Sequence, residues 1–179
     1  MFSFTKEQTR FELNGTKIGG LPGENPTFMF GTLFYEGEFE KTGGILKEAQ
    51  KLVKKQEEFS KKTYVPATPD IFIYEENEIQ WKIDFALNNI SGCFSLDMPE
   101  SDVRIKALEY LKEQDALDRV IYNSINIGIV QEEIETLKRC TPRSAIVLAF
   151  NPKSGSVQGR LDIIKDGGQL LDKGLIEIA

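Results

Sequence analysis

The feature that most constrains the fold is a regular alternation of short apolar segments with amphipathic ones. Apolar runs occupy residues 27–35, 71–74, 93–96, 120–122 and 145–150. Between them, apolar residues recur at helical spacing over residues 45–59, 79–90, 103–111 and 131–138. Strands that alternate with helices in this way are typical of consecutive βαβ units around a parallel sheet. We therefore predict an α/β fold with about five parallel strands.

Local patterns add detail to this prediction. Phe11 and Leu13 alternate with polar residues before Asn14-Gly15, the preferred two-residue hairpin turn, so a short β-hairpin should precede the sheet. The nearly unbroken apolar run from Thr27 to Tyr35 suits a strand covered on both faces. Asn77 is placed to cap the helix over 79–90. No low-complexity linker divides the chain, which we interpret as a single domain over residues 1–179.

Composition excludes several classes of function. The formal net charge of -6 provides no basic field for a nucleic-acid backbone. The lysines between 51 and 62 are interpreted as a solvated helix face. The sequence contains no apolar run of about 18 residues, so no transmembrane segment is predicted. The opening residues, MFSFTKEQTR, lack an apolar signal core, and we expect a cytoplasmic protein.

The sequence contains no histidine and only two cysteines, Cys93 and Cys140. The lack of histidine excludes Ser-His-Asp and Cys-His catalysis and every histidine-based metal site. The cysteines are far apart and lie outside any CxxC motif, so we predict two small core residues and no disulfide. We expect no protein-bound metal, and any chemistry must use carboxylates, amides, hydroxyls, lysines or a bound cofactor.

Polar residues follow the predicted strands. They are Glu36, Glu75, Glu76, Asp97, Asn123 and Asn151, with Asn126 shortly after Asn123. The carboxyl ends of parallel strands form one face, so these side chains should converge on a pocket. An Asp and several amides offer donors and acceptors that suit a flat heterocycle such as a pterin, purine or flavin. Such residues also begin turns and cap helices, and that alternative stays open.

Several strings, taken together, resemble the family of the H subunit of tetrahydromethanopterin S-methyltransferase. They are MFSFTKEQ at the start, Ile18–Glu24 with Pro26-Thr27, Gly31–Tyr35, Asp118–Asn126, Ser144–Pro152 and Asp172–Leu175. The strings occur in the family's order and span essentially the whole chain.

The resemblance implies a TIM-type (β/α)8 barrel that binds a methylated pterin at its C-terminal face. It implies transfer of the N5-methyl group of methyl-tetrahydromethanopterin, or of methyl-tetrahydrofolate, to the cobalt of a corrinoid (cobalamin) on a partner protein. Asp97 and Asn123 match the Asp and Asn that hold the pterin, and Asn123 would act in catalysis by polarising N5. Asn126 and Asn151 are the further expected pterin contacts. Met98 and Pro99, which follow Asp97, would narrow or reshape that site.

A full barrel of this type needs about 250 residues, and this sequence has 179. We therefore expect a partial barrel, the N-terminal portion of a pterin-binding methyltransferase. An open sheet would be closed by a second copy in a homo-oligomer or by another chain. Expected partners are a corrinoid protein or subunits of a membrane methyltransferase complex, to which the protein would be peripheral. The alternative function is a truncated, non-catalytic interaction module of such a complex. An unrelated α/β binding protein is a weaker third reading.

Overall fold

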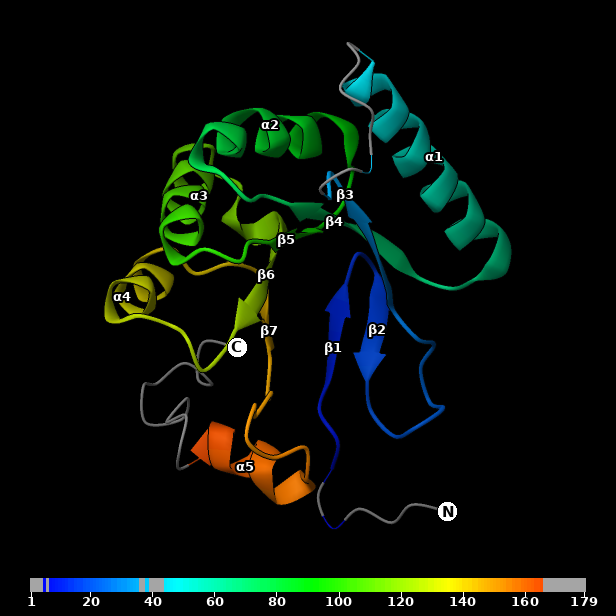
Figure 1. Cartoon of the computed structure of the whole chain (residues 1–179). Helices are drawn as coiled ribbons and strands as arrows, with labels where there is room; N and C mark the ends of the chain where they lie inside the picture. Colours follow the sequence, from blue (N-terminus) through cyan, green and yellow to red (C-terminus); the bar gives the residue numbers. More distant parts are fainter. Residues whose placement is uncertain (1–4, 6, 36–37, 39–43, 166–179) are drawn as a thin grey trace.

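The computed structural model describes residues 5, 7–35, 38 and 44–165, as a sheet with helices around it (Figure 1). The strands are β1 (Arg10–Leu13), β2 (Thr16–Gly19), β3 (Met29–Leu33), β4 (Ala67–Phe72), β5 (Phe94–Asp97), β6 (Val120–Ile125) and β7 (Ser144–Val147). The helices are α1 (Ile45–Thr63), α2 (Ile79–Asn89), α3 (Ser101–Glu113), α4 (Gln131–Arg139) and α5 (Val157–Lys165). Two short 3-10 helices, η1 (Glu76–Glu78) and η2 (Leu117–Arg119), precede α2 and β6.

Five strands form one parallel sheet in the order β3-β4-β5-β6-β7, and β1 pairs with β2 in an antiparallel hairpin. The sheet order follows the chain without the reversal that marks a doubly wound fold. Helices α1 to α4 lie in an arc around one side of the sheet, as in successive units of a (β/α) barrel (Figure 1). The predicted α/β class, its parallel strands and the N-terminal hairpin are confirmed.

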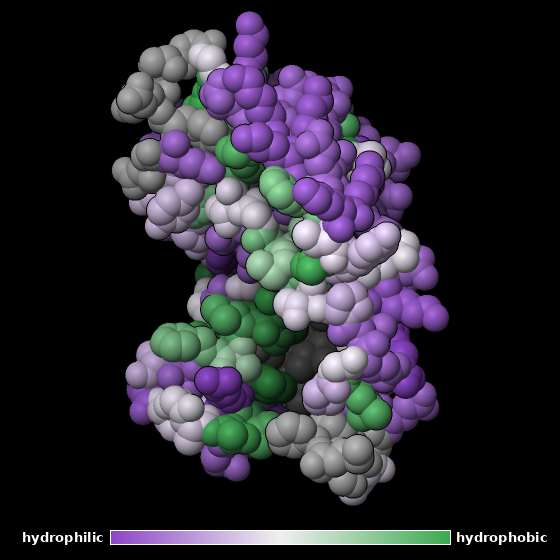
Figure 2. Space-filling view, turned by 90° about the vertical axis from the view of Figure 1, so that its right-hand side faces the viewer, coloured by the Kyte–Doolittle hydropathy of each residue, from purple (hydrophilic) through white to green (hydrophobic). Residues whose placement is uncertain are grey.

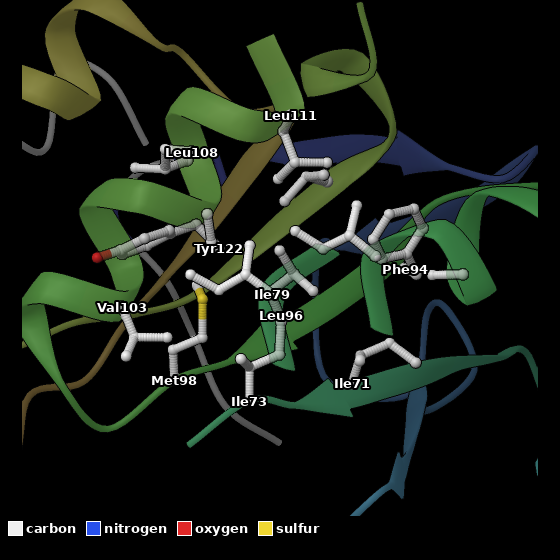
Figure 3. Packing of buried hydrophobic residues seen from close by; sticks show 14 of the residues in the cluster. Ile71, Ile73, Ile79, Phe94, Leu96, Met98, Val103, Leu108, Leu111 and Tyr122 are labelled. Atoms are coloured by element: carbon white, nitrogen blue, oxygen red, sulfur yellow. The ribbon is translucent and has the colours of Figure 1, made fainter. Parts of the chain in front are cut away.

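The main core lies between the sheet and this arc of helices. Alternate residues along the strands enter it, among them Ile71, Phe94, Leu96 and Tyr122, and all are fully buried. This side of the sheet is called the outer face, and the opposite side the inner face. Met98 is also buried, and Figure 3 shows it beside Val103 of α3. Because Met98 faces the helices, its side chain fills the core and does not narrow a site on the inner face.

The apolar run at residues 27–35 forms an edge strand, and the expectation that both its faces are covered was wrong. In β3, Met29 is 50% exposed and Phe30 is 39% exposed. The reason is position: β3 is the first strand of the described sheet, and only β4 pairs with it. Figure 2 shows hydrophobic residues gathered around a hollow, below the hydrophilic surface of α1.

Other differences concern boundaries and caps. Strand β4 begins at Ala67, four residues before the predicted start. Helix α5 was not predicted, because only Gly159 and Ile163 in it are buried. Asn77 does not cap α2: it lies within η1, where Glu75 is the N-cap and Glu78 completes a capping box. Both cysteines are free; Cys140 is buried as predicted, whereas Cys93 is half-buried.

The N-terminal hairpin is fixed to the amino end of the sheet. The Asn14 Oδ1 atom accepts a hydrogen bond of 2.5 Å from the Cys93 backbone N–H, immediately before β5. The hairpin turn has positive φ at Asn14 and Gly15, which matches the preferred Asn-Gly turn. The hairpin is therefore attached at the amino end of the sheet, opposite the carboxyl ends of the strands. In the described ranges, none of the helices is both long enough and apolar enough to span a membrane.

Candidate functional site

The candidate site lies on the inner face, where strand register places side chains in two layers. In the upper layer, at the carboxyl ends of the strands, Asp97 of β5 pairs in register with Asn123 of β6. Their neighbours in this layer are Phe72 and Ile146. The lower layer contains Thr32, Asp70, Ser95, Ile121 and Ser144 in register across all five strands. Polar groups thus run from Thr32 to Ser95 below the strand ends, and Ile121 separates them from Ser144.

Asp97 and Asn123 are half-buried, and their side chains make no hydrogen bond within the part of the chain that the structure describes. Burial raises the pKa of the Asp97 carboxyl, the nearby Asp70 raises it further, and Arg104 opposes both. A carboxyl group and an amide therefore lie side by side at a strand end with their hydrogen-bonding capacity unused. Of the four predicted pterin contacts, the structure brings these two together.

The side chains of the other two predicted contacts, Asn126 and Asn151, form hydrogen bonds with nearby backbone groups. Asn126 Oδ1 accepts from the Gly128 N–H at 2.8 Å, and its Nδ2 donates to the Ser124 carbonyl at 3.3 Å. Asn151 Oδ1 accepts from the Lys153 N–H at 2.9 Å, and its Nδ2 donates to the Gly159 carbonyl at 2.9 Å. Both amides are engaged in the loops after β6 and β7.

The remaining strand-end carboxylates have local partners. Glu75 forms the capping box with Glu78 at the start of η1. Glu76 forms an exposed ion pair of 2.5 Å with Lys106 of α3. Glu36 lies outside the described residues. For Glu75 the structure supports the alternative interpretation as a cap, and Glu76 instead forms a surface ion pair.

A buried network on the outer face supports both Asp97 and Asn123. Arg104 of α3 donates from Nη1 to the Met98 carbonyl at 2.9 Å and from Nη2 to Glu133 Oε2 at 2.9 Å. The Tyr122 hydroxyl donates to the other oxygen of Glu133. Met98 directly follows Asp97, and Tyr122 directly precedes Asn123. The network therefore links the two strand ends through a single buried carboxylate.

The network contains residues that sequence reasoning missed. Arg104 and Glu133 sit in predicted helices, but neither was predicted to be buried; Arg104 is 4% exposed and Glu133 is 0% exposed. A sequence signal was available for Arg104, which lies between the buried Val103 and Ile105. For Glu133 the signal was its place next to the apolar stripe of α4.

Asp70 was also missed, and it belongs to the inner face. It lies in the middle of β4 and is 4% exposed. Its Oδ2 accepts a hydrogen bond of 3.3 Å from the Thr32 hydroxyl, while its buried Oδ1 has no partner in the described residues. The signal was a carboxylate directly before the apolar residues Ile71 and Phe72, which was overlooked because the strand was predicted to begin at Ile71.

The arrangement can accept hydrogen bonds through Asp70 and Asp97, and it can donate and accept through Asn123. This donor and acceptor set fits the edge of a flat heterocycle better than a phosphate. Within the described ranges, no cluster of three or more histidine, cysteine, aspartate or glutamate side chains could hold a metal ion.

Sequence comparison gives the family. The family described as "Tetrahydromethanopterin S-methyltransferase MtrH subunit" matches residues 6–179. The H subunit of this enzyme from Methanothermobacter marburgensis is 40% identical over 184 residues, which cover 100% of this chain and 59% of that protein. The H subunit of a putative methyltransferase, mtx, from Methanosarcina barkeri is 39% identical over 189 residues, again with 100% and 59% coverage.

The H subunit of the tetrahydromethanopterin enzyme from Methanococcus aeolicus is 34% identical over 189 residues, covering 100% of this chain and 58% of that protein. The chain thus spans about 59% of the length of the curated relatives that it matches. The match runs through both the hairpin and the strands that carry Asp97 and Asn123, so the chain belongs to the family of the tetrahydromethanopterin S-methyltransferase MtrH subunit.

Proposed function

We propose that this chain forms the pterin-binding part of a methyltransferase. The reaction moves the N5-methyl group of methyl-tetrahydromethanopterin, or of methyl-tetrahydrofolate, to a corrinoid cobalt on a partner protein. The observation that carries the proposal is the pairing of Asp97 with Asn123, in register, at the carboxyl ends of adjacent strands. The names of the relatives support the tetrahydromethanopterin substrate.

In the proposed mechanism, the protein supplies position and polarisation. The Asp97 carboxylate accepts hydrogen bonds from the amino and N–H edge of the pterin, and this fixes the ring. The Asn123 amide donates toward N5, and this hydrogen bond strengthens as negative charge develops there while the methyl group leaves. A corrinoid supplied by the partner provides the nucleophilic cobalt. Asn126 and Asn151 shape the rim, because their amides order the loops that border the site.

The buried network makes this geometry rigid. Arg104 also donates to the Pro99 carbonyl at 2.8 Å and to the Ser101 hydroxyl at 2.9 Å, which fixes the turn after Asp97. Preorganised groups need little rearrangement as the reaction proceeds, which is the main route by which polar residues accelerate such transfers.

Calorimetry tests the proposal directly. Methyl-tetrahydromethanopterin and methyl-tetrahydrofolate are titrated into the chain at ligand concentrations up to about 1 mM. This range detects dissociation constants as weak as about 1 mM. We expect binding of one or both, and weaker binding by Asp97→Ala. Asp102→Ala, an exposed carboxylate at the start of α3, is the matched control and should bind as the unchanged chain does. Absence of heat with both ligands contradicts the proposal.

A second candidate function, a non-catalytic interaction module, is favoured by a different feature. An apolar pocket of about 410 Å³ lies between the hairpin and the amino ends of β3, β6 and β7. Its lining includes Phe11, Phe28, Phe30 and Ile121, and several hydrophobic side chains at its border are exposed. Exposed apolar surface of this kind marks an interaction site.

The partners that we propose follow from both candidates. They are a corrinoid protein, subunits of the methyltransferase complex at a membrane, or a second chain that pairs with β3 and β7, the outer strands of the described sheet. Pull-down of the tagged chain from its source cells separates the two functions. Recovery of a corrinoid partner without pterin binding favours the module, whereas pterin binding favours the methyltransferase.

A further inference from the structure

The lower layer of the inner face contains buried polar atoms without partners. Among the described residues, buried side-chain atoms that lack a hydrogen bond are Asp70 Oδ1, Ser95 Oγ, Ser144 Oγ and Arg104 Nε. Asp70 of β4 and Ser95 of β5 are direct register partners, and Ser144 of β7 lies in the same layer, separated from Ser95 by Ile121 of β6. A buried, unsatisfied polar atom costs stability, so three of them in one layer call for a function.

Asp70 is the charged member of this layer and lies close to Asp97. Ser95, its register partner on β5, is two residues before Asp97, so the two carboxyl groups are diagonal neighbours on one face. Their proximity is repulsive, and Asp70 raises the pKa of Asp97. The Thr32 hydroxyl donates to one oxygen of Asp70 and leaves the other oxygen unused.

We propose that Asp70 is a second hydrogen-bond acceptor for the ligand, one layer below Asp97. Its carboxylate accepts a hydrogen bond from an N–H group on the same edge of the heterocycle that Asp97 binds. The inference rests on the proposed function, because it assigns a further contact to the same ligand. An exocyclic amino group carries two N–H bonds and can donate to two carboxylates at once. A ring that enters edge first brings this group below the strand ends, where it relieves the repulsion between the carboxylates and satisfies Asp70 Oδ1.

The proposal specifies a ligand class: a flat ring with an amino group next to a ring N–H. Replacing that amino group by a carbonyl turns two donors into an acceptor, which two carboxylates would repel. The site should therefore reject the oxo analogue strongly, since leaving buried polar groups unpaired or opposed costs more than losing one contact.

The test compares two probes of the same shape, 2-amino-4-oxopteridine and 2,4-dioxopteridine, by fluorescence titration of the full chain. We expect the unchanged chain to prefer the amino compound by roughly a hundredfold. Asp70→Asn keeps the shape of the side chain but removes its charge, and it should reduce that preference by roughly tenfold. Asp102→Asn, on the exposed surface of α3, is the matched control and should leave the preference unchanged.

A second variant covers the case in which Asp70→Asn does not fold. Thr32→Val removes the hydroxyl that orients Asp70, at an edge strand that tolerates valine, and should reduce the preference severalfold. If the unchanged chain discriminates between the probes but neither variant alters the ratio, Asp70 makes no ligand contact; the inference fails and the proposed function stands. If the unchanged chain binds neither probe, both are overturned.

Discussion

The outer and inner faces of the same sheet differ in how their polar groups are satisfied. On the outer face, Glu133 is fully buried yet accepts from both Arg104 and Tyr122. On the inner face, Asp70 Oδ1, Ser95 Oγ and Ser144 Oγ have no partner in the described part of the chain. The outer face also contains one such atom, Arg104 Nε, but its guanidinium donates through both other nitrogens, whereas the inner face contains three of the four. The following predictions test this contrast by the change in the free energy of unfolding, from the largest expected effect to the smallest.

Glu133→Ala should be the most destabilising of these changes. It leaves the Arg104 guanidinium buried without its counter-charge and the Tyr122 hydroxyl without its acceptor. Breaking a buried pair by removing one partner costs about 3–5 kcal/mol. Urea unfolding measures the loss, and Glu132→Ala, an exposed neighbour on α4, serves as the control. A loss no larger than that of the control would show that the network does not stabilise the fold.

Leu96→Ala should give the second-largest loss in the free energy of unfolding. Leu96 is fully buried on the outer face, in the cluster seen in Figure 3. Removing most of a buried leucine side chain costs about 2–5 kcal/mol, because transfer and cavity terms add. The same denaturation measurement applies, with Leu46→Ala, a 48% exposed leucine on α1, as the comparison. Similar losses for the two leucines would contradict the assignment of the core to this face.

Asn123→Ala should barely affect stability, by less than about 1 kcal/mol, because the side chain makes no hydrogen bond in the described part of the chain. In an active assembly with the partner, however, it should lower the rate of methyl transfer roughly a hundred- to a thousandfold. Thermal unfolding and single-turnover methyl transfer measure the two effects. A variant that melts as a core mutant does would make this amide structural, and an unchanged rate would remove it from the mechanism.

Asp97→Asn should give a small gain in stability at neutral pH. Burial and Asp70 raise the pKa of Asp97 in the folded state, with Arg104 opposing, so the folded protein binds more protons than the unfolded chain does. Stability therefore falls as the pH rises from the ordinary carboxyl pKa, about 4, through the raised value. The variant lacks this penalty, so its advantage in melting temperature should shrink as the pH is lowered toward 4. An advantage that is independent of pH would show that the carboxylate charge is not the cause.

Local sequence patterns predicted the elements well because each apolar run or stripe reflects burial on one face. They predicted that Asp97 and Asn123 lie close together, because both stand at the ends of recognisable strands. They failed where neighbours in space decide the outcome. The burial of Arg104 depends on Glu133, which is 29 residues away. The exposure of Met29 depends on the position of β3 at the sheet edge. Asp70 was missed because a strand boundary was placed too late.

The hydrogen bond between Asn14 and Cys93 has a consequence for the order of folding. The two residues are 79 positions apart, so their hydrogen bond closes a long loop and carries a large entropic cost. The contacts of β4 with β5 and of β5 with β6 are closer in sequence and should form earlier. The hairpin should therefore dock onto a sheet that already exists, and its amides should exchange with solvent before those of the central strands. The end of the sheet opposite the candidate site is, on this view, the last part to assemble and the first to open.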